Sequence, residues 1–219
     1  RGSGLDPAAL ELIDAAHAKM LRETEGVPLK DYPTLFMEFH SALPATLEAG
    51  LQSVREICAE MGAIEFIATT DTAERKRLWH ARHHSYEIMV RSHPGKQFFI
   101  MDVAVPISAY PELISFVETV TARDGATAYM IGHAGDGNIH VEFPYDTPES
   151  FDRAMKLNGE IVLKALELGG TATGEHGVGM GKAKYMPAEH GEALDVMRSI
   201  KATLDPNGIL NPGKVFPNG

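Results

Sequence analysis

The run at residues 132–140, GHAGDGNIH, restricts the local fold more than any other stretch of the chain. Apolar residues precede and follow it, and Asp136 and Gly137 at its centre form a pair that favours a tight hairpin turn. The pattern predicts a strand, a turn and a second strand. Such a hairpin brings His133 and His140 together at its mouth, and two neighbouring imidazoles are a good start for a metal site.

The rest of the chain alternates between stretches with strand-like and helix-like apolar patterns. Strands are predicted at 34–40, 63–69 and 98–105, and helices at 5–25, 44–61, from Thr72 onward, after Pro106, at 148–168 and at 193–204. This order indicates an α+β fold, a mostly antiparallel sheet with helices packed on it, ferredoxin-like and either single or doubled. A doubly wound parallel sheet is the alternative.

Length and charge narrow the class of protein. The chain has 219 residues, enough for one sizeable domain, which we assign to 5–219, with 1–4 as a linker or cloning remnant. The net charge of −10 argues against a nucleic-acid partner and an anionic membrane surface. No apolar run reaches membrane-spanning length. A single cysteine, Cys58, allows no intrachain disulfide and fits a cytoplasmic compartment.

A second unusual run, TGEHGVG at residues 173–179, is expected to meet the hairpin in space. His133, His140 and Glu175 would then form a set of two histidines and one carboxylate. Three protein ligands with an open position are the usual arrangement for a catalytic divalent metal. His176 follows directly and is a candidate general base, because histidines ordinarily titrate near neutrality.

For three other polar residues the sequence allows both a functional and a purely structural interpretation. Asp136 and Asn138 could orient the imidazoles or contact substrate, or they could simply supply turn geometry. The planar guanidinium of Arg82 suits a substrate carboxylate, but this basic stretch could equally be a solvated helix face. The glycine-rich run at 177–182 does not fit a phosphate loop, because Ala183 stands where serine or threonine is needed. We interpret it as a close approach of backbone to a ligand or a neighbouring domain.

Together, these runs resemble a known family. The chain is similar, from about Leu5 onward, to the C-terminal domain of FAD-linked oxidases of the D-lactate dehydrogenase, D-2-hydroxyglutarate dehydrogenase and glycolate oxidase group in the vanillyl-alcohol oxidase superfamily. The matching stretches are 78–82, 101–106, 132–140, 173–179 and 204–214.

The resemblance implies oxidation of a D-2-hydroxy acid to the 2-oxo acid, with hydride passing from C2 to the flavin of FAD. It also implies roles for individual residues: His133, His140 and Glu175 as ligands of zinc or manganese, His176 as the base for the hydroxyl proton, Arg82 and Asn138 at the substrate, and Asn211 and Lys214 in a tail near the flavin.

Two departures from the family pattern bear on function. Members that oxidise dicarboxylic hydroxy acids carry a lysine just before the aspartate of the strand at 98–105, where this chain has Ile100 and Met101. A small substrate such as lactate or glycolate is therefore expected. The family's FAD-binding domain is absent from these residues, so this chain alone should neither hold FAD firmly nor turn over.

Partners follow from the same resemblance: the hydroxy-acid substrate, an FAD-binding domain and an electron acceptor that the sequence does not identify. The acceptor could place the protein at a membrane surface, and association of identical chains is left open. Two other functions use the same residues. One is a non-catalytic binding module of the same fold, and the other is a metal-dependent hydrolase that needs no flavin.

Overall fold

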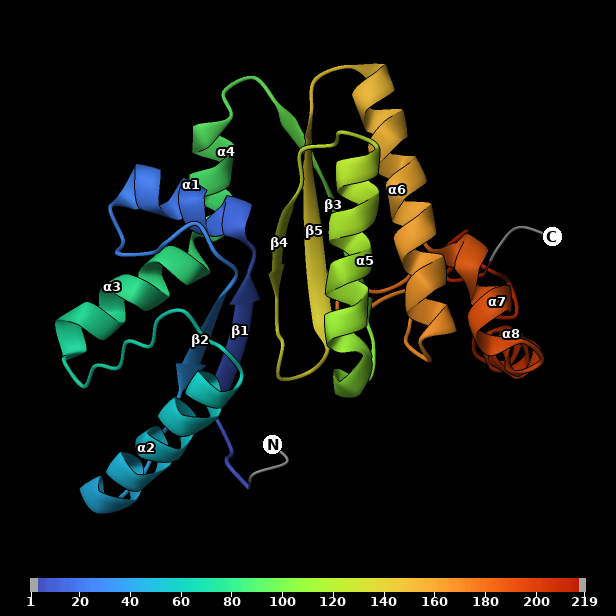
Figure 1. Ribbon diagram of the computed structural model, residues 1–219. Helices are drawn as coiled ribbons and strands as arrows, with labels where there is room; N and C mark the ends of the chain where they lie inside the picture. Colours follow the sequence, from blue (N-terminus) through green and yellow to red (C-terminus); the bar gives the residue numbers. More distant parts are fainter. Residues whose placement is uncertain (1–3, 217–219) are drawn as a thin grey trace. The chain divides into compact units, whose positions relative to one another are not determined.

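The computed structural model describes residues 4–216, so most of the expected linker at 1–4 lies outside the described residues. The chain divides into two compact units, residues 1–94 and 95–219, which are described separately. Figure 1 labels the helices and strands of both.

The first unit contains β1 (Ala9–Ile13), α1 (Ala15–Glu25), β2 (Thr34–Glu38), α2 (Pro44–Glu60), α3 (Thr72–His83) and α4 (Ser85–Ser92). The second contains β3 (Gln97–Ala104), a short 3₁₀ turn (Ile107–Ala109), α5 (Tyr110–Arg123), β4 (Tyr129–Gly132), β5 (Asn138–Tyr145), α6 (Pro148–Glu167), a second 3₁₀ turn (Ala183–Tyr185), α7 (Met186–His190) and α8 (Ala193–Leu204).

The helix predicted at 5–25 is wrong in its first half. Residues of β1 pair antiparallel with β2, from Ala9 opposite Glu38 to Ile13 opposite Thr34. The helix begins only after Asp14, whose side chain accepts a hydrogen bond of 2.8 Å from the backbone amide of His17. That cap satisfies an amide that the first helical turn leaves without a partner, so the chain changes from strand to helix there.

The strand predicted at 63–69 is also wrong, because this stretch is irregular. Its two isoleucines, Ile64 and Ile67, are 65% and 59% exposed, so the apolar alternation does not mark a buried sheet face. A strand also needs a neighbouring strand to satisfy its backbone hydrogen-bonding groups, and among the described residues no strand pairs with the stretch at 63–69.

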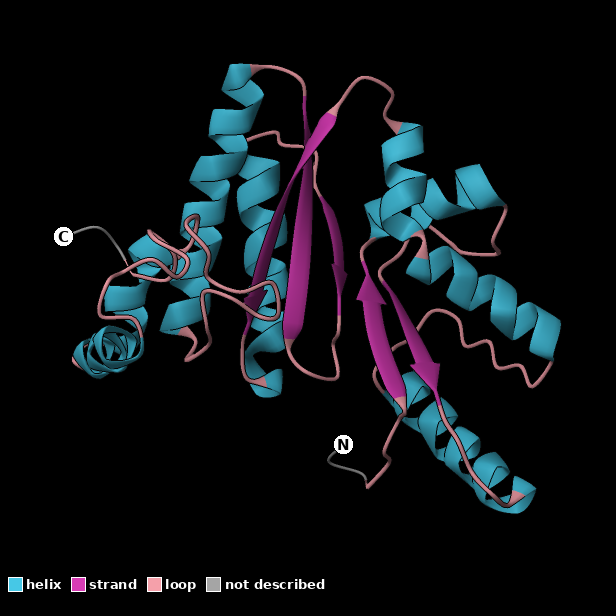
Figure 2. Cartoon of the chain, turned by 180° about the vertical axis from the view of Figure 1, so that it is seen from behind, coloured by secondary structure: helices cyan, strands magenta, loops and turns pink. Residues whose placement is uncertain are grey.

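The sheet of the second unit has the order β4-β5-β3, and both pairs are antiparallel (Figure 2). Ile131 lies opposite His140, and Asp102 lies opposite the same His140 on the other side. The hairpin predicted at 132–140 is confirmed. With the β1–β2 pair also antiparallel, the α+β class is confirmed, and the doubly wound parallel alternative does not hold.

Two long helices cover this sheet. Helices α5 and α6 pack against each other, and α6 packs against β3 and β5 (Figure 1). Along β5, Ile139, Val141 and Phe143 alternate with Asn138, His140 and Glu142, and all six are buried. Because neighbouring strand residues point to opposite faces, the apolar set and the polar set occupy different faces of the sheet.

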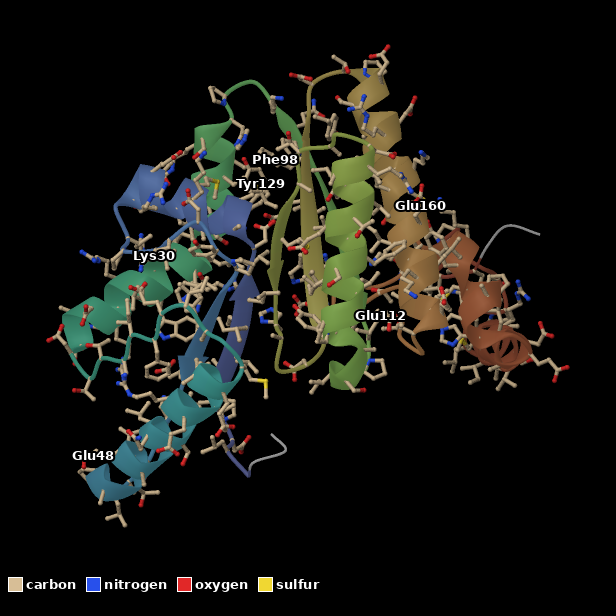
Figure 3. All side chains as sticks on the ribbon, in the orientation of Figure 1. Lys30, Glu48, Phe98, Glu112, Tyr129 and Glu160 are labelled. Carbon is tan, nitrogen blue, oxygen red and sulfur yellow. The ribbon has the colours of Figure 1, made fainter. Side chains whose placement is uncertain are left out.

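Charged pairs join the outer sides of α5 and α6. Glu112, labelled in Figure 3, lies 2.8 Å from Lys164, and Arg123 lies 3.0 Å from Glu160. The start of α6 is as predicted: Thr147 caps it by accepting from the Ser150 amide at 3.2 Å. The two ion pairs join the helices that cover the sheet.

Asp124 should contribute to stability only above the acid range. Hydrogen bonds from Arg123 and Lys156 lower the pKa of the Asp124 carboxyl from 3.8 to about 2. A lowered folded-state pKa gives stability that is full above the unfolded value and is lost as pH falls through the folded value. We expect Asp124→Asn to lower the melting temperature by a few degrees at pH 7 and to lose most of that effect near pH 2. A difference that persisted unchanged down to pH 2 would contradict this origin.

Candidate metal and substrate site

The turn of the β4–β5 hairpin places the first histidine. His133 follows β4, and its carbonyl accepts from the amides of Asp136 at 2.9 Å and Asn138 at 3.3 Å. The backbone of Gly137 is left-handed, with a φ of 73°. Asp136 therefore stands in the turn itself, and its amide helps to close the turn; this supports the turn-geometry reading of this residue.

Three side chains meet beside this turn. Nε2 of His140 lies 2.9 Å, and Nε2 of His133 3.4 Å, from the same oxygen, Oε1 of Glu175. Two ligand atoms of a tetrahedral zinc ion with bonds of about 2.0–2.1 Å would be roughly 3.3 Å apart. Both nitrogen–oxygen distances are therefore close to the spacing of a ligand set, and the three atoms all lie within 4.8 Å of one another. The two sequence runs do meet in space as predicted.

His176 lies beside this group and packs against His140. Its ring stacks on the ring of His140, with centroids 4.7 Å apart and planes within 7°. The two residues differ in burial, because the side chain of His140 is 11% exposed and that of His176 is 47% exposed. An exposed imidazole against a buried one can exchange a proton with a bound molecule while its neighbour stays in place.

The electrostatic surroundings favour a neutral His140. Burial lowers the pKa of its imidazole, and the Asp102 carboxylate acts in the opposite direction. The net effect is a pKa below the ordinary histidine value, so the ring is neutral at pH 7. Neutral imidazole is the form that binds a metal ion.

A residue without a predicted role stands behind these candidate ligands. Asp102 is fully buried in β3 directly opposite His140, with Oδ1 3.5 Å from Nδ1 of that histidine. Burial alone would raise the pKa of the Asp102 carboxyl, but hydrogen bonds from the His176 amide and the Asn138 side chain lower it to about 2. The sequence signal was a lone charge inside the apolar strand at 98–105.

Asn138 uses one end of its side-chain amide for structural hydrogen bonds. Its amide group donates to Oδ1 of Asp102 at 2.7 Å and to the carbonyl of Val103 at 3.0 Å. Its Oδ1 makes no hydrogen bond to any residue between 4 and 216. This oxygen is buried and can act only as an acceptor, and the predicted role of Asn138 at the substrate stays a prediction.

Gly174 lets the second run approach the sheet closely. A Cβ atom built on Gly174 would lie 1.9 Å from Nδ2 of Asn138 and 2.6 Å from Oδ1 of Asp102. No side chain fits there unless the contact between those two residues opens. The absence of a side chain at this position is therefore part of how the loop reaches the site.

The variant Gly174→Ala should lose about 1–3 kcal/mol of unfolding free energy, as overpacked sites do. The matched control is Gly181→Ala in the same loop, because a Cβ atom there meets nothing within 4 Å. That control should stay within about 0.5 kcal/mol of the parent. Chemical denaturation measures both. Equal losses would show that the loop does not depend on the close approach.

Comparison with known proteins supports the same reading of the chain. The family described as "FAD linked oxidases, C-terminal domain" matches residues 1–215. The chain belongs to this family. The match covers both compact units, so the family's C-terminal domain comprises both together.

Curated relatives cover almost all of the chain. It is 38% identical over 98% of its length to the mitochondrial D-lactate dehydrogenase [cytochrome] of Arabidopsis thaliana, of which it covers 38%. It is 29% identical, again over 98% of its length, to the glycolate oxidase subunit GlcD of Escherichia coli K12, of which it covers 44%. The chain thus spans less than half the length of these relatives.

A solved structure has the same fold. The 4-ethylphenol oxidase of Gulosibacter chungangensis in its isoeugenol complex matches with a TM-score of 0.66 and 16% identity, covering 96% of this chain and 48% of that one. At this identity the likeness concerns the fold alone. Among residues 4–216, the structure has no helix with both the length and the apolar character needed to cross a bilayer.

Arg82 lies in the first unit, on α3, and is mostly buried. Its Nη2 donates to a carboxylate oxygen of Glu11, and the exposed fractions of the two side chains are only 11% and 12%. This pairing argues against the solvated-face reading. Its Nε is buried and has no hydrogen-bond partner among the described residues, so one donor of the guanidinium is left over. The role of Arg82 at the substrate stays a prediction.

The tail that carries Asn211 and Lys214 turns back on the glycine-rich run. The Lys214 amide donates to the Asn211 carbonyl at 3.2 Å, and the Val215 amide donates to the Gly179 carbonyl at 2.8 Å. Asn211 has a left-handed backbone, with a φ of 47°. The expected role of Asn211 and Lys214 near a flavin is not tested by these contacts and stays a prediction.

Proposed function

We propose that the chain is the substrate- and metal-binding part of a flavin-dependent dehydrogenase that oxidises a D-2-hydroxy acid of lactate or glycolate size to the 2-oxo acid. The observation that carries the proposal is the convergence of two imidazole nitrogens on one oxygen of Glu175. Membership in the family of FAD-linked oxidase C-terminal domains supports the reaction class. The names of the relatives support the substrate class.

The donor set suits a divalent metal that accepts nitrogen and oxygen ligands, such as zinc or manganese. His133, His140 and Glu175 would hold it. When bound, the metal would polarise the substrate hydroxyl, and FAD, bound mainly by another domain, would accept the hydride. The rest of the chemistry belongs to side chains of this chain.

His176 is the residue that we assign to the hydroxyl proton. Its imidazole is exposed beside the ligand set and stacks on His140, which stays neutral. A ring nitrogen of His176 would take the proton as the hydroxyl group becomes a carbonyl and the hydride passes to FAD. Asn138 is assigned to the substrate as well, because its Oδ1 is an acceptor without a described partner.

Arg82 is the residue that we assign to the substrate carboxylate. Its pairing with Glu11 holds the guanidinium in one orientation, and its buried Nε remains as a donor. Positive charge on a planar fork binds a carboxylate more strongly than a neutral donor does. Because Glu11 already uses one side of the fork, a single carboxylate fits this role better than two.

Asn211 and Lys214, in the tail, are assigned to contacts with the cofactor. An FAD-binding domain and an electron acceptor complete the set of proposed partners, and self-association is left open. A cytoplasmic location fits the single cysteine, whereas the Arabidopsis thaliana relative is named as mitochondrial. Fractionation of cells that express the tagged protein would decide between the two compartments.

The proposal is tested by metal and substrate binding to the purified chain. After removal of metal with a chelator, the chain should take up about one Zn²⁺ or Mn²⁺. Calorimetric titration should then detect D-lactate or glycolate binding to the metal-loaded chain, with Arg82→Met weakening it by about 10-fold or more. A folded chain that takes up neither metal would refute the proposed site. Metal uptake without hydroxy-acid binding would favour a different substrate class.

A further inference from the structure

Asp102 forms hydrogen bonds with both ends of the loop at 174–182. It lies in β3 and is completely buried. A buried carboxylate that remains ionised must be compensated by donors. The identity of those donors shows what the carboxylate does.

The first donors are two backbone amides at the start of this loop. Oδ2 of Asp102 accepts from the amide of Glu175 at 3.0 Å and from the amide of His176 at 3.0 Å. Two successive amides aimed at one carboxylate oxygen fix the backbone at those two residues. Their side chains are the expected third metal ligand and the expected base.

The second donor comes from the other end of the same loop. Nζ of Lys182 lies 3.3 Å from Oδ2 of Asp102 and also donates to the backbone carbonyl of Asp102. The Lys182 side chain is only 14% exposed. One aspartate therefore holds the loop both where it begins, at Glu175, and where it ends, at Lys182.

Asp102 also contacts the hairpin side of the site. Its Oδ1 accepts from the side chain of Asn138 at 2.7 Å and lies 3.5 Å from Nδ1 of His140. A metal-bound histidine is usually oriented by a carboxylate on its other ring nitrogen, and Nε2 of His140 faces Glu175. The Asp102 carboxylate thus contacts both β5, through Asn138 and His140, and the loop that carries Glu175 and His176.

Distance alone would allow Asp102 to be a metal ligand with His140 and His176. The hydrogen bonds argue otherwise. A carboxylate offers about four acceptor positions, and Asp102 already accepts from two amides, one side-chain amide and one ammonium group. Three of these donors bind Oδ2 and Asn138 binds Oδ1, which also faces Nδ1 of His140 at 3.5 Å, so an ion could bind Asp102 only by displacing one of these groups.

We propose that Asp102 and Lys182 form a positioning pair that holds Glu175, His176 and His140 in the arrangement needed for metal binding and proton transfer. The role of the pair in metal binding and proton transfer rests on the proposed function. Its effect on the order of the 174–182 loop does not, and that effect can be measured without metal. Neither residue touches the reacting atoms in this scheme.

Two measurements on the 219-residue chain test the pair. The first is hydrogen exchange of the Glu175 and His176 amides in the metal-free protein. Asp102→Asn is nearly isosteric but replaces an acceptor oxygen with a donor, so protection of these two amides should fall by about 10-fold or more. Asp124→Asn, which changes an acid of the same unit away from the site, should leave their exchange unchanged.

The second measurement is the dissociation constant for Zn²⁺ or Mn²⁺, determined by competition with a chelator. Asp102→Asn should weaken binding by about 10–100-fold, the usual effect of removing a partner behind a metal ligand. Lys182→Met should weaken it less, and Lys182→Arg should restore part of the loss. Lys184→Met is the control from the same segment. The double variant should lose less than the sum of the single losses, because the two residues act as one unit.

The outcomes separate this inference from the proposed function. A parent chain that binds no metal refutes the metal site, and the exchange of the two amides then decides the positioning role alone. A parent that binds metal, with Asp102→Asn equal to it in both exchange and affinity, overturns the positioning pair. If Asp102→Asn does not fold, Lys182→Met is judged by the same two measurements, and unchanged exchange and affinity in that variant overturn the pair equally.

Discussion

Replacing His140 with alanine is expected to abolish metal binding by the chain. His140 contacts every other part of the cluster and is its most buried imidazole: its Nε2 faces Glu175, and its ring stacks on His176 and stands edge-on to His133 at a centroid distance of 5.8 Å. Loss of an outer partner of a ligand already costs about 10–100-fold in affinity. Loss of the central ligand should cost more than about 100-fold, measured by chelator competition or as metal content after dialysis.

The control for this variant is His190→Ala. His190 lies in the same unit and pairs with Glu189 at 3.7 Å, outside the cluster. The variant His190→Ala should therefore leave the metal affinity of the chain unchanged. Because His140 is buried, a melting curve must first show that His140→Ala is folded. A folded variant that retained metal within about 3-fold would show that the ion binds elsewhere.

The hairpin and the closeness of its two histidines were predictable because their signals are local. Asp136 and Gly137 specify a turn within a few residues, and a turn between two apolar stretches forces the flanking strands to pair. The position of the partner run was also correct, since Glu175 reaches both histidines. That prediction depended on unusual residue types rather than on any rule for which distant segments meet.

The errors arose where pairing is non-local. Leu10, Ile13, His17 and Leu21 have helical spacing, yet the first two belong to a strand whose partner lies about 25 residues away. Nothing in a window around Leu10 reports that partner. The same limit explains why Asp102 received no role. Its donors come from residues 36 to 80 positions further along the chain, and no periodicity connects them.

Arg82, Asn211 and Lys214 illustrate a different limit. Their residue types suit the proposed tasks, and the structure gives each a definite local setting. Their tasks, however, concern a substrate and a flavin rather than contacts within the chain. Those assignments therefore depend on binding experiments, whereas the assignments of His133, His140 and Glu175 rest on contacts within one unit.

The largest loss of stability is expected for Gly137→Ala, at the turn that brings the ligands together. The φ of 73° at this residue costs a non-glycine residue about 1–2 kcal/mol. A Cβ atom there would also lie 1.9 Å from the carbonyl oxygen of Val105, which is backbone and cannot rotate away. Overpacking of this kind adds about 1–3 kcal/mol. The combined loss should lower the melting temperature by roughly 10 °C.

Gly125→Ala separates the two causes. Gly125 is also left-handed, with a φ of 59°, but a Cβ atom on it meets nothing within 4 Å. It should lose only the backbone contribution, a few degrees in melting temperature. Gly137→Ala should in addition displace the Val105 amide, which donates to the Gly137 carbonyl at 3.0 Å, and so move His133 relative to His140. We therefore expect this variant alone to weaken metal binding; equal melting temperatures and affinities for the two variants would mean that the contact with Val105 does not support the site.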